Sequence, residues 1–281
     1  MSGRVGGQRT APLVMGVLNV TPDSFSDGGR WLHPDAAVRH GIELIDDGAA
    51  IVDVGGESTR PGAEPVAVDE ELRRVIPVVD ALARDGRAAV SVDTTKAAVA
   101  QAAIAAGATV VNDVSAGRFD PEMLSMVAGA GVQYVAMHMQ GEPRTMQRDP
   151  HYDDVVREVG DFLLDRIAVA TAAGVAPEQI VVDPGIGFGK TRAHNLALLA
   201  ALPSLAARVG APVLIGTSRK TFIGAVLDLP PDERDEGTLA TVAWVAERGA
   251  SIVRVHDVRS AIRTIALLNV MRRATPEGLA A

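Results

Sequence analysis

The 281-residue chain contains no cysteine, which excludes disulfide scaffolds and thiolate chemistry. Aromatic residues make up only 3% of the chain, and there is no excess of basic residues, because the formal net charge is -8. An acidic chain does not suit a nucleic-acid surface, so we expect no nucleic-acid partner. This charge still allows a local basic cluster that binds an anionic ligand.

Long hydrophobic runs are also missing. No apolar run approaches the roughly 20 residues of a membrane span, so we expect no membrane association. The N-terminal segment MSGRVGGQRTAP is polar and glycine-rich and lacks the apolar core of a signal peptide. These features predict a cytoplasmic protein, and a hydrophobic fraction of 47% is sufficient for a substantial core.

Short apolar runs rich in valine and isoleucine recur along the chain, as is typical of strands buried on both faces of a parallel sheet. The predicted strands are 13–18, 51–54, 88–92, 109–112, 133–137, 180–182, 213–215 and 252–255. Alanine-rich segments of helical periodicity alternate with them, at 34–47, 69–84, 95–106, 121–130, 153–173, 193–207, 236–248 and 258–273. Eight such units predict the α/β class and a single (β/α)8 TIM barrel, with a doubly wound open sheet as the alternative.

Composition shows no linker that would divide the chain. We therefore expect one domain over residues 1–281, with disordered tails at 1–12 and 274–281. In a (β/α)8 barrel the chemistry lies at the carboxyl ends of the strands, where the βα loops gather. The residues at or just beyond these ends are largely polar, and they include Asn19, Asp53, Asp93, Asn112, His138, Asp183, Ser218, Lys220, Arg254 and His256.

Two groups among these residues suggest a ligand. Asp93, Asn112 and Asp183 end three different strands, and their side chains can bind a polar heterocycle with donor and acceptor edges. Each of them alone is also explained as a helix cap or turn residue. Lys220, Arg254 and His256 follow the last two strands, where barrels often bind phosphate. An ion pair is the alternative for Arg254.

The segment DPGIGFGKT (183–191) resembles a nucleotide-binding P-loop but fails the spacing, because Pro184 stands where glycine is required. We interpret it as a glycine-rich loop that approaches a flat ligand, with Phe188 as an apolar wall and Lys190 facing solvent. The polar loop 55–66 is either solvated or a lid. The remaining histidines show no metal-binding spacing, so we expect no transition-metal site.

Eight motifs together resemble those of the dihydropteroate synthases, over about residues 15–263. They are MGVLNVTPDSFSDGG, DVGGESTRPGA, SVDTTKAAVA, VNDVS, MHMQGEPRTMQ, DPGIGFGK, GTSRKTFIG and VRVHDV. The resemblance implies the TIM-barrel fold, a cytoplasmic homodimer and a requirement for Mg²⁺. It also implies a sulfonamide-sensitive transferase of folate biosynthesis that joins 6-hydroxymethyl-7,8-dihydropterin diphosphate to 4-aminobenzoate, giving 7,8-dihydropteroate and pyrophosphate.

The resemblance also assigns roles to individual residues. The pterin would be bound by Asp93, Asn112, Met137, Asp183 and Lys220. The diphosphate would be bound by Asn19, Thr59, Arg254 and His256, with Asn19 also a Mg²⁺ ligand. The aminobenzoate would be framed by Phe25, Ser58, Arg60, Pro61, Phe188 and Ser218. The residues implied in catalysis are Asp27, Lys220, Arg254 and His256.

The implied mechanism is SN1-like, because a pterin-stabilised cation forms before the arylamine attacks. Two other functions remain as alternatives. One is a pterin-binding module without synthase activity, which the two intact loops 19–29 and 57–63 disfavour. The other is a barrel lyase or aldolase that uses Lys220 as a Schiff base. Trp244 and Leu267–Leu268 are candidates for the dimer contact, with burial in the core as the alternative.

Overall fold

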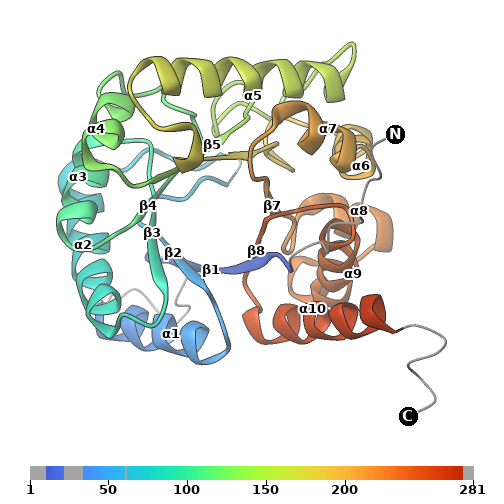
Figure 1. The fold of residues 1–281 in the computed structure, drawn as a ribbon, viewed down its shortest axis with the longest axis horizontal. Coiled ribbons are helices and arrows are strands. Elements are labelled where there is room, and N and C mark those ends of the chain that lie inside the picture. Colours follow the sequence, from blue (N-terminus) through green and yellow to red (C-terminus); the bar gives the residue numbers. More distant parts are fainter. Residues whose placement is uncertain (1–10, 22–33, 61, 275–281) are drawn as a thin grey trace, which may run out of the picture.

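The computed structural model describes residues 11–21, 34–60 and 62–274. Eight parallel strands form one sheet in the order β6-β5-β4-β3-β2-β1-β8-β7. An isolated bridge between Val182 and Val213 joins the two outer strands, so the sheet is almost completely closed (Figure 1). The predicted (β/α)8 barrel is confirmed, and the open-sheet alternative is wrong. Of the predicted tails, residues 1–10 and 275–281 lie outside the described residues.

The strands lie close to the predicted positions. They are β1 Leu13–Asn19, β2 Ile51–Gly55, β3 Ala89–Asp93, β4 Val110–Asp113, β5 Gln133–Met137, β6 Ile180–Asp183, β7 Leu214–Gly216 and β8 Ile252–Val255. The helices around them are α1 Pro34–Asp46, α2 Val68–Asp85, α3 Ala97–Ala105, α4 Met123–Ala130, α5 Val155–Ala172, α6 Arg192–Ala200, α7 Leu202–Val209, α8 Thr221–Leu227, α9 Asp235–Ala246 and α10 Val258–Arg273.

Two differences from the predicted helices have a local cause. The predicted helix 193–207 is divided into α6 and α7 at Ala201. Pro203 lies in the first turn of α7, where its missing N–H costs nothing, whereas inside a continuous helix it would remove a hydrogen bond. The short helix α8 was not predicted, because its sequence TFIGAVL combines glycine with β-branched residues and carries a weak helix signal.

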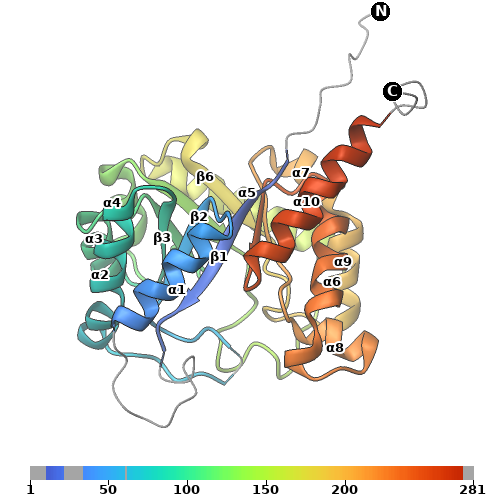
Figure 2. The same cartoon turned by 90° about the horizontal axis from the view of Figure 1, so that it is seen from below.

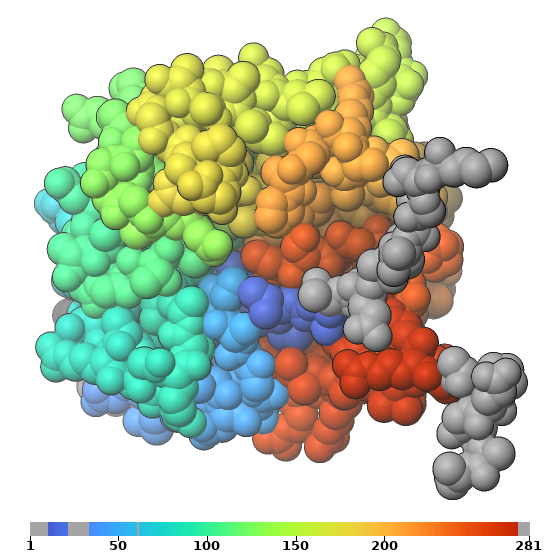
Figure 3. Space-filling view, in the orientation of Figure 1, coloured from blue at the N-terminus to red at the C-terminus, as the bar shows by residue number. Residues whose placement is uncertain are grey.

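Alternating side chains of the strands fill the barrel. Near the amino ends of the strands, an inner layer of apolar side chains consists of Met15, Ile51, Val110, Val135, Val181, Leu214 and Ile252. The alternate residues, such as Val52 and Val54 of β2, are fully buried against the helices. In the space-filling view, closely packed atoms cover this face of the barrel (Figure 3). This apolar layer leaves the carboxyl ends of the strands as the place for polar groups.

The βα loops gather at one edge of the barrel. In Figure 2 the loops after β2 and β5 lie at the lower edge, whereas the start of β1 and the end of α10 point to the opposite edge. In the part of the chain that the structure describes, no helix combines the length and apolarity needed to cross a bilayer.

Candidate active site

Strand register brings the predicted pterin-binding residues together. Asp93 lies directly beside Asn112 on β3 and β4, and Met137 lies beside Asp183 on β5 and β6. All four are buried. Two residues before Asn112, Met137 and Asp183, the inner side chains are the apolar Val110, Val135 and Val181, whereas β3 has buried Ser91 at this position. The structure thus places these four residues on four consecutive strands at one end of the barrel.

A charged network connects this layer across the barrel. The Arg254 guanidinium donates from Nε to Asp53 Oδ2 (2.6 Å) and from Nη2 to Asp93 Oδ2 (2.8 Å). Asn112 Nδ2 donates to the same Asp53 oxygen at 2.9 Å. Asp53 is fully buried. It was not among the assigned site residues, although its position in the strand motif IVDVG offered a signal. These contacts fix Arg254 and Asn112 in place before any ligand arrives.

Asp93 retains an unused hydrogen-bond acceptor. Its Oδ1 has no partner among the described residues, although the side chain is only 8% exposed. Burial raises the pKa of Asp93 to about 7, and the neighbouring Asp53 carboxylate adds to the rise, while Arg254 opposes it. A buried carboxylate oxygen without a donor is costly. An N–H group of a bound ligand would satisfy it.

Asp183 is the last residue of β6 and Lys220 follows β7, and the charges of the two side chains interact. Burial raises the pKa of Asp183 to about 6, although the Gly185 backbone N–H donates to its Oδ1 at 2.7 Å. Burial and the nearby Arg254 lower the pKa of Lys220 to about 8. The Lys220 ammonium lies 4.2 Å from the centroid of the Phe188 ring, which is a cation–π contact. The predicted pterin residue Lys220 and the predicted wall Phe188 are therefore neighbours.

His256 is held by Ser218. The Ser218 hydroxyl lies 2.9 Å from His256 Nδ1 and accepts a hydrogen bond from the His256 backbone N–H at 3.2 Å. Burial and the positive charge of Arg254 lower the pKa of His256 to about 3, so the imidazole is neutral at physiological pH. It can therefore act as a hydrogen-bond donor to an anion but not as a cation.

The loop after β2 carries four of the assigned residues, three of which lie in the described part of the chain. Ser58 and Thr59 are half-buried and Arg60 is exposed. Glu57 anchors this loop, because its Oε2 accepts from the Val66 backbone N–H (2.7 Å) and from the Lys96 ammonium (2.6 Å). The anchor keeps the loop at the rim of the barrel.

Asn19 ends β1 beside Gly55 of β2. A Cβ placed on Gly55 would lie 3.5 Å from the Asp93 Cβ and 3.8 Å from the Asn19 Oδ1, so the missing side chain leaves space between these two residues. Three assigned residues, Phe25, Asp27 and Pro61, lie outside the described residues.

The interpretation of Lys190 as solvent-facing is wrong. Its side chain is only 3% exposed, and it contacts His138, which is also buried. A single lysine after a glycine-rich segment gives no sign of burial, because its side-chain partner His138 lies 52 residues away in the sequence and its other two acceptors are backbone carbonyls.

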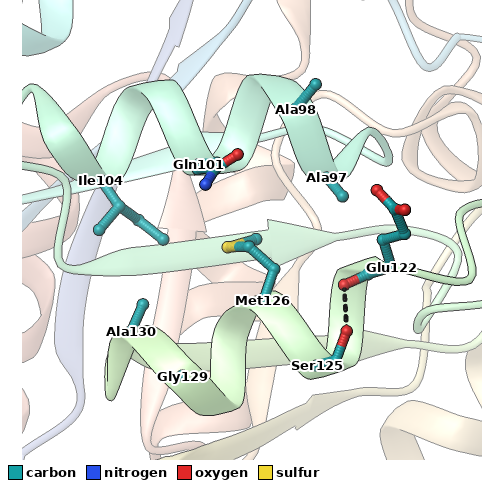
Figure 4. A pocket seen from close by; sticks show the side chains of 9 residues that line it. All are labelled: Ala97, Ala98, Gln101, Ile104, Glu122, Ser125, Met126, Gly129 and Ala130. Carbon is teal, nitrogen blue, oxygen red and sulfur yellow. Dashed lines mark hydrogen bonds between the residues drawn. The ribbon is translucent and has the colours of Figure 1, made fainter.

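A surface groove of about 600 Å³ lies on the outside of the barrel between α3 and α4. Figure 4 shows its mainly small and apolar side chains, with Ser125 donating to the Glu122 carbonyl. None of the assigned site residues lines it. The groove is therefore separate from the candidate active site.

Comparison with known proteins agrees with this geometry. Residues 15–256 match the family model described as "Pterin binding enzyme". The chain belongs to this family of pterin-binding enzymes. Within the family its relatives are dihydropteroate synthases, and the enzyme of Mycobacterium leprae is 51% identical over 276 residues, which cover 95% of this chain and 96% of that one.

Solved structures show the same fold. Dihydropteroate synthase of Xanthomonas albilineans with 4-aminobenzoic acid has a TM-score of 0.89 and 47% identity, covering 94% of each chain. The same organism's enzyme in complex with 7,8-dihydropteroate has a TM-score of 0.85 and 44% identity, covering 94% of this chain and 95% of that one.

Proposed function

We infer that this protein is a dihydropteroate synthase, a transferase of folate biosynthesis. It joins 6-hydroxymethyl-7,8-dihydropterin diphosphate to 4-aminobenzoate and releases 7,8-dihydropteroate and pyrophosphate. The observation that carries this conclusion is the combination of buried Asp93 and Asp183 with cationic Lys220 and Arg254 at the carboxyl end of a barrel of this family. Related enzymes have been solved with aminobenzoic acid and with the product.

The buried polar layer suits the pterin. The unpartnered Asp93 Oδ1 and the Asp183 carboxylate can accept N–H bonds from the amino-pyrimidine edge of the ring. Asn112 is held by Asp53 and offers its amide oxygen as a further acceptor. Met137 packs with Met139, Met146 and Val114 as an apolar surface for the ring. We propose that the pterin lies deepest in the barrel.

The diphosphate would lie nearer the rim. Arg254 is 23% exposed and can keep its two carboxylate partners while a further N–H meets a phosphate oxygen. Neutral His256 can donate one hydrogen bond, Asn19 is the last residue of β1, and Thr59 lies on the loop after the neighbouring strand β2. The described residues contain no cluster of three or more His, Asp or Glu side chains that could hold a metal ion.

Such a donor set fits Mg²⁺ that is bound mainly through substrate, because this ion prefers oxygen ligands and often takes few of them from the protein. The Asn19 amide oxygen would be the protein ligand. When bound, Mg²⁺ would neutralise charge on the departing pyrophosphate.

We propose that the carbon–oxygen bond to the diphosphate breaks first. The bonding electrons leave with pyrophosphate, and the resulting pterin cation is stabilised by Asp93 and Asp183. The aminobenzoate nitrogen then attacks the cationic carbon and loses a proton. Phe188 and Ser218, together with Ser58 and Arg60 of the second loop, would frame the aminobenzoate, and sulfonamides would compete there. Phe25, Asp27 and Pro61 keep their proposed roles as predictions.

We propose a homodimer as well. Leu267, Val270 and Met271 are exposed on one face of α10, and Trp244 is exposed on neighbouring α9 (Figure 1). Apolar side chains gathered on one face are typical of an association surface. A cytoplasmic location remains a prediction.

The decisive experiment is a pyrophosphate-release assay with both substrates and Mg²⁺. We expect release that depends on aminobenzoate and is inhibited by a sulfonamide. Binding of the pterin diphosphate without aminobenzoate-dependent release would instead identify a binding module. Borohydride trapping of a carbonyl substrate on Lys220 would identify an aldolase.

A further inference from the structure

Lys190 is a buried amine that the proposed reaction does not use. Burial lowers its pKa to about 7, and the Asp183 carboxylate opposes this shift. Lys190 precedes α6 and is 3% exposed. Its ammonium lies 2.8 Å from His138 Nδ1 and donates to the carbonyls of Gly185 (2.9 Å) and Phe188 (3.0 Å). An ammonium has three N–H donors, so these three acceptors satisfy it completely. Such complete pairing is what a buried charge requires.

His138 is suited to be the third acceptor. Burial and the adjacent Lys190 lower the pKa of His138 to about 2, so the ring is neutral and Nδ1 offers a lone pair. The ring packs edge-to-face on Phe162, with centroids 4.8 Å apart. The His138 backbone N–H also donates to the Asp183 carbonyl at 2.8 Å. The loop after β5 and the loop after β6 are therefore joined at both backbone and side chain.

The glycine-rich loop 184–191 is tightly packed against the loop after β5. Gly185 has a φ of +68°, and a Cβ there would lie 1.9 Å from the His138 carbonyl oxygen. Further along, Gln147 Nε2 donates to the Gly187 carbonyl (2.6 Å), and the Tyr152 hydroxyl donates to the Gly189 carbonyl (2.9 Å). Two carbonyls of this loop are thus bound by side chains of the loop after β5, and Lys190 binds two more, those of Gly185 and Phe188.

The end of β6 and the loop 184–191 that follows it carry two residues proposed to contact the substrates. Asp183 is the last residue of β6, and its carboxylate accepts from the Gly185 N–H (2.7 Å). Phe188 supplies the ring that meets the Lys220 ammonium. Lys190 holds the carbonyls of Gly185 and Phe188, one beside each contact. If these two carbonyls lost their hydrogen bonds to Lys190, the backbone would shift and the Asp183 and Phe188 side chains would move with it.

We propose that Lys190, in contact with His138, is a positioning residue that fixes the Asp183 carboxylate and the Phe188 ring for the pterin and aminobenzoate subsites. The inference rests on the proposed synthase function. Lys190 acts through the loop and touches neither substrate. Its loss would leave the Phe188 carbonyl and one imidazole nitrogen without donors in a buried site, and the Gly185 carbonyl would keep only the Phe188 backbone N–H at 3.0 Å. The loop would rearrange to expose or re-pair these groups.

Steady-state kinetics of Lys190→Met test this role, because methionine keeps the length of the side chain and removes the donors. We expect KM to rise about tenfold or more for both substrates, with kcat per active site falling less than about threefold. Arg192→Met is the matched control, because Arg192 lies two residues further on, is exposed and donates to the Ala225 carbonyl at 3.2 Å. It should leave both KM values unchanged.

A pair of variants at His138 tests the acceptor. His138→Asn retains an acceptor near the Nδ1 position, whereas His138→Leu removes it, and both lose the ring packing. We expect KM to rise as in Lys190→Met for leucine and to stay near the native value for asparagine. This pair also decides the matter if Lys190→Met fails to fold.

The role is overturned if Lys190→Met, or His138→Leu in its place, lowers the melting temperature but leaves both KM values unchanged. It is equally overturned if both His138 variants behave alike. Lack of turnover by the native protein would instead refute the proposed synthase function, which separates the two failures.

Discussion

At the scale of single residues, the site is built from carboxylates that burial makes reluctant to ionise. The pKa of Asp93 is raised to about 7 and that of Asp183 to about 6. Because both exceed the ordinary value near 4, the folded protein binds protons more strongly than the unfolded chain, and the stability contribution of these groups falls as the pH rises from about 4 through 7. Keeping these two carboxylates ionised for a ligand therefore lowers the stability of the folded protein.

The pH dependence of pterin binding follows from these shifts. An ionised carboxylate accepts N–H bonds better than a carboxylic acid, so we expect pterin affinity to fall as the pH is lowered from 8 to 5. Asp93→Asn should remove the inflection near pH 7 and leave the one near pH 6. Isothermal titration calorimetry with a pterin across this range measures both. Affinity that does not change with pH would contradict the prediction.

Asp53 gives a second prediction at this scale. Its Oδ2 accepts from Arg254 Nε at 2.6 Å and from Asn112 Nδ2 at 2.9 Å, and its side chain is fully buried. Removing one partner of a buried ion pair is costly, on the order of 3–5 kcal/mol, because the other charge remains buried. We expect Asp53→Asn to lower both the melting temperature and kcat/KM, the latter by about tenfold to a hundredfold.

Asp46→Asn is the matched control for this change. Asp46 is exposed and pairs with Arg87 on the surface, where solvent screening leaves an ion pair with little effect on stability. Its kinetics and melting temperature should stay close to those of the native protein. An Asp53→Asn protein as active and stable as this control would show that the network has no functional role.

At the scale of elements, the loop after β2 depends on one buried anchor. Lys96, just before α3, forms ion pairs with Glu57 of the loop and with fully buried Glu71 of α2. Glu57 also accepts from the Val66 backbone N–H, so it closes the loop on itself. The pKa of Lys96 is raised, since the two carboxylates outweigh the effect of burial that would lower it. These contacts therefore fix the two ends of the loop.

Lys96→Met should remove the ion pair to Glu57 and so free the loop after β2 to move. Because Ser58 and Arg60 lie on the loop, we expect KM to rise several-fold for aminobenzoate and much less for the pterin diphosphate. Initial rates with each substrate varied in turn give both constants. A larger change in the pterin constant would place the loop at the other subsite and reject our assignment.

At the scale of the whole molecule, the barrel exposes an apolar surface on its last helices. Leu267 is 63% exposed, Val270 66% and Met271 61%, and their spacing of three and four residues puts them on one face of α10. Trp244, considered as a possible core residue, is 44% exposed and donates from Nε1 to the Leu199 carbonyl. Burial between two copies would remove this surface from water.

We expect sedimentation velocity to show a dimer for the native protein. A double substitution, Leu267→Glu with Met271→Glu, should give a folded monomer, because two charges would have to be desolvated at the contact. A native monomer, or a double variant that remains dimeric, would place the contact elsewhere or exclude it. Circular dichroism confirms that the variant is folded.

The sequence by itself determined the barrel and most of the polar groups at its carboxyl end. Valine-rich runs such as 51–54 can be buried only between helices on one side and the barrel interior on the other, and the strand period then directs Asp93 and Asp183 inward. Both the burial of apolar runs and the two-residue period of a strand follow from the local sequence, and neither depends on which other segments pack against the strand.

Only the tertiary structure decided which groups pair. The Arg254 guanidinium contacts Asp53, 201 residues away, and Lys190 is buried because His138 and two carbonyls surround it. Burial and hydrogen bonding depend on neighbours from distant segments, and no local pattern records them. The same glycine-rich segment would leave its lysine in water if the loop after β5 did not cover it.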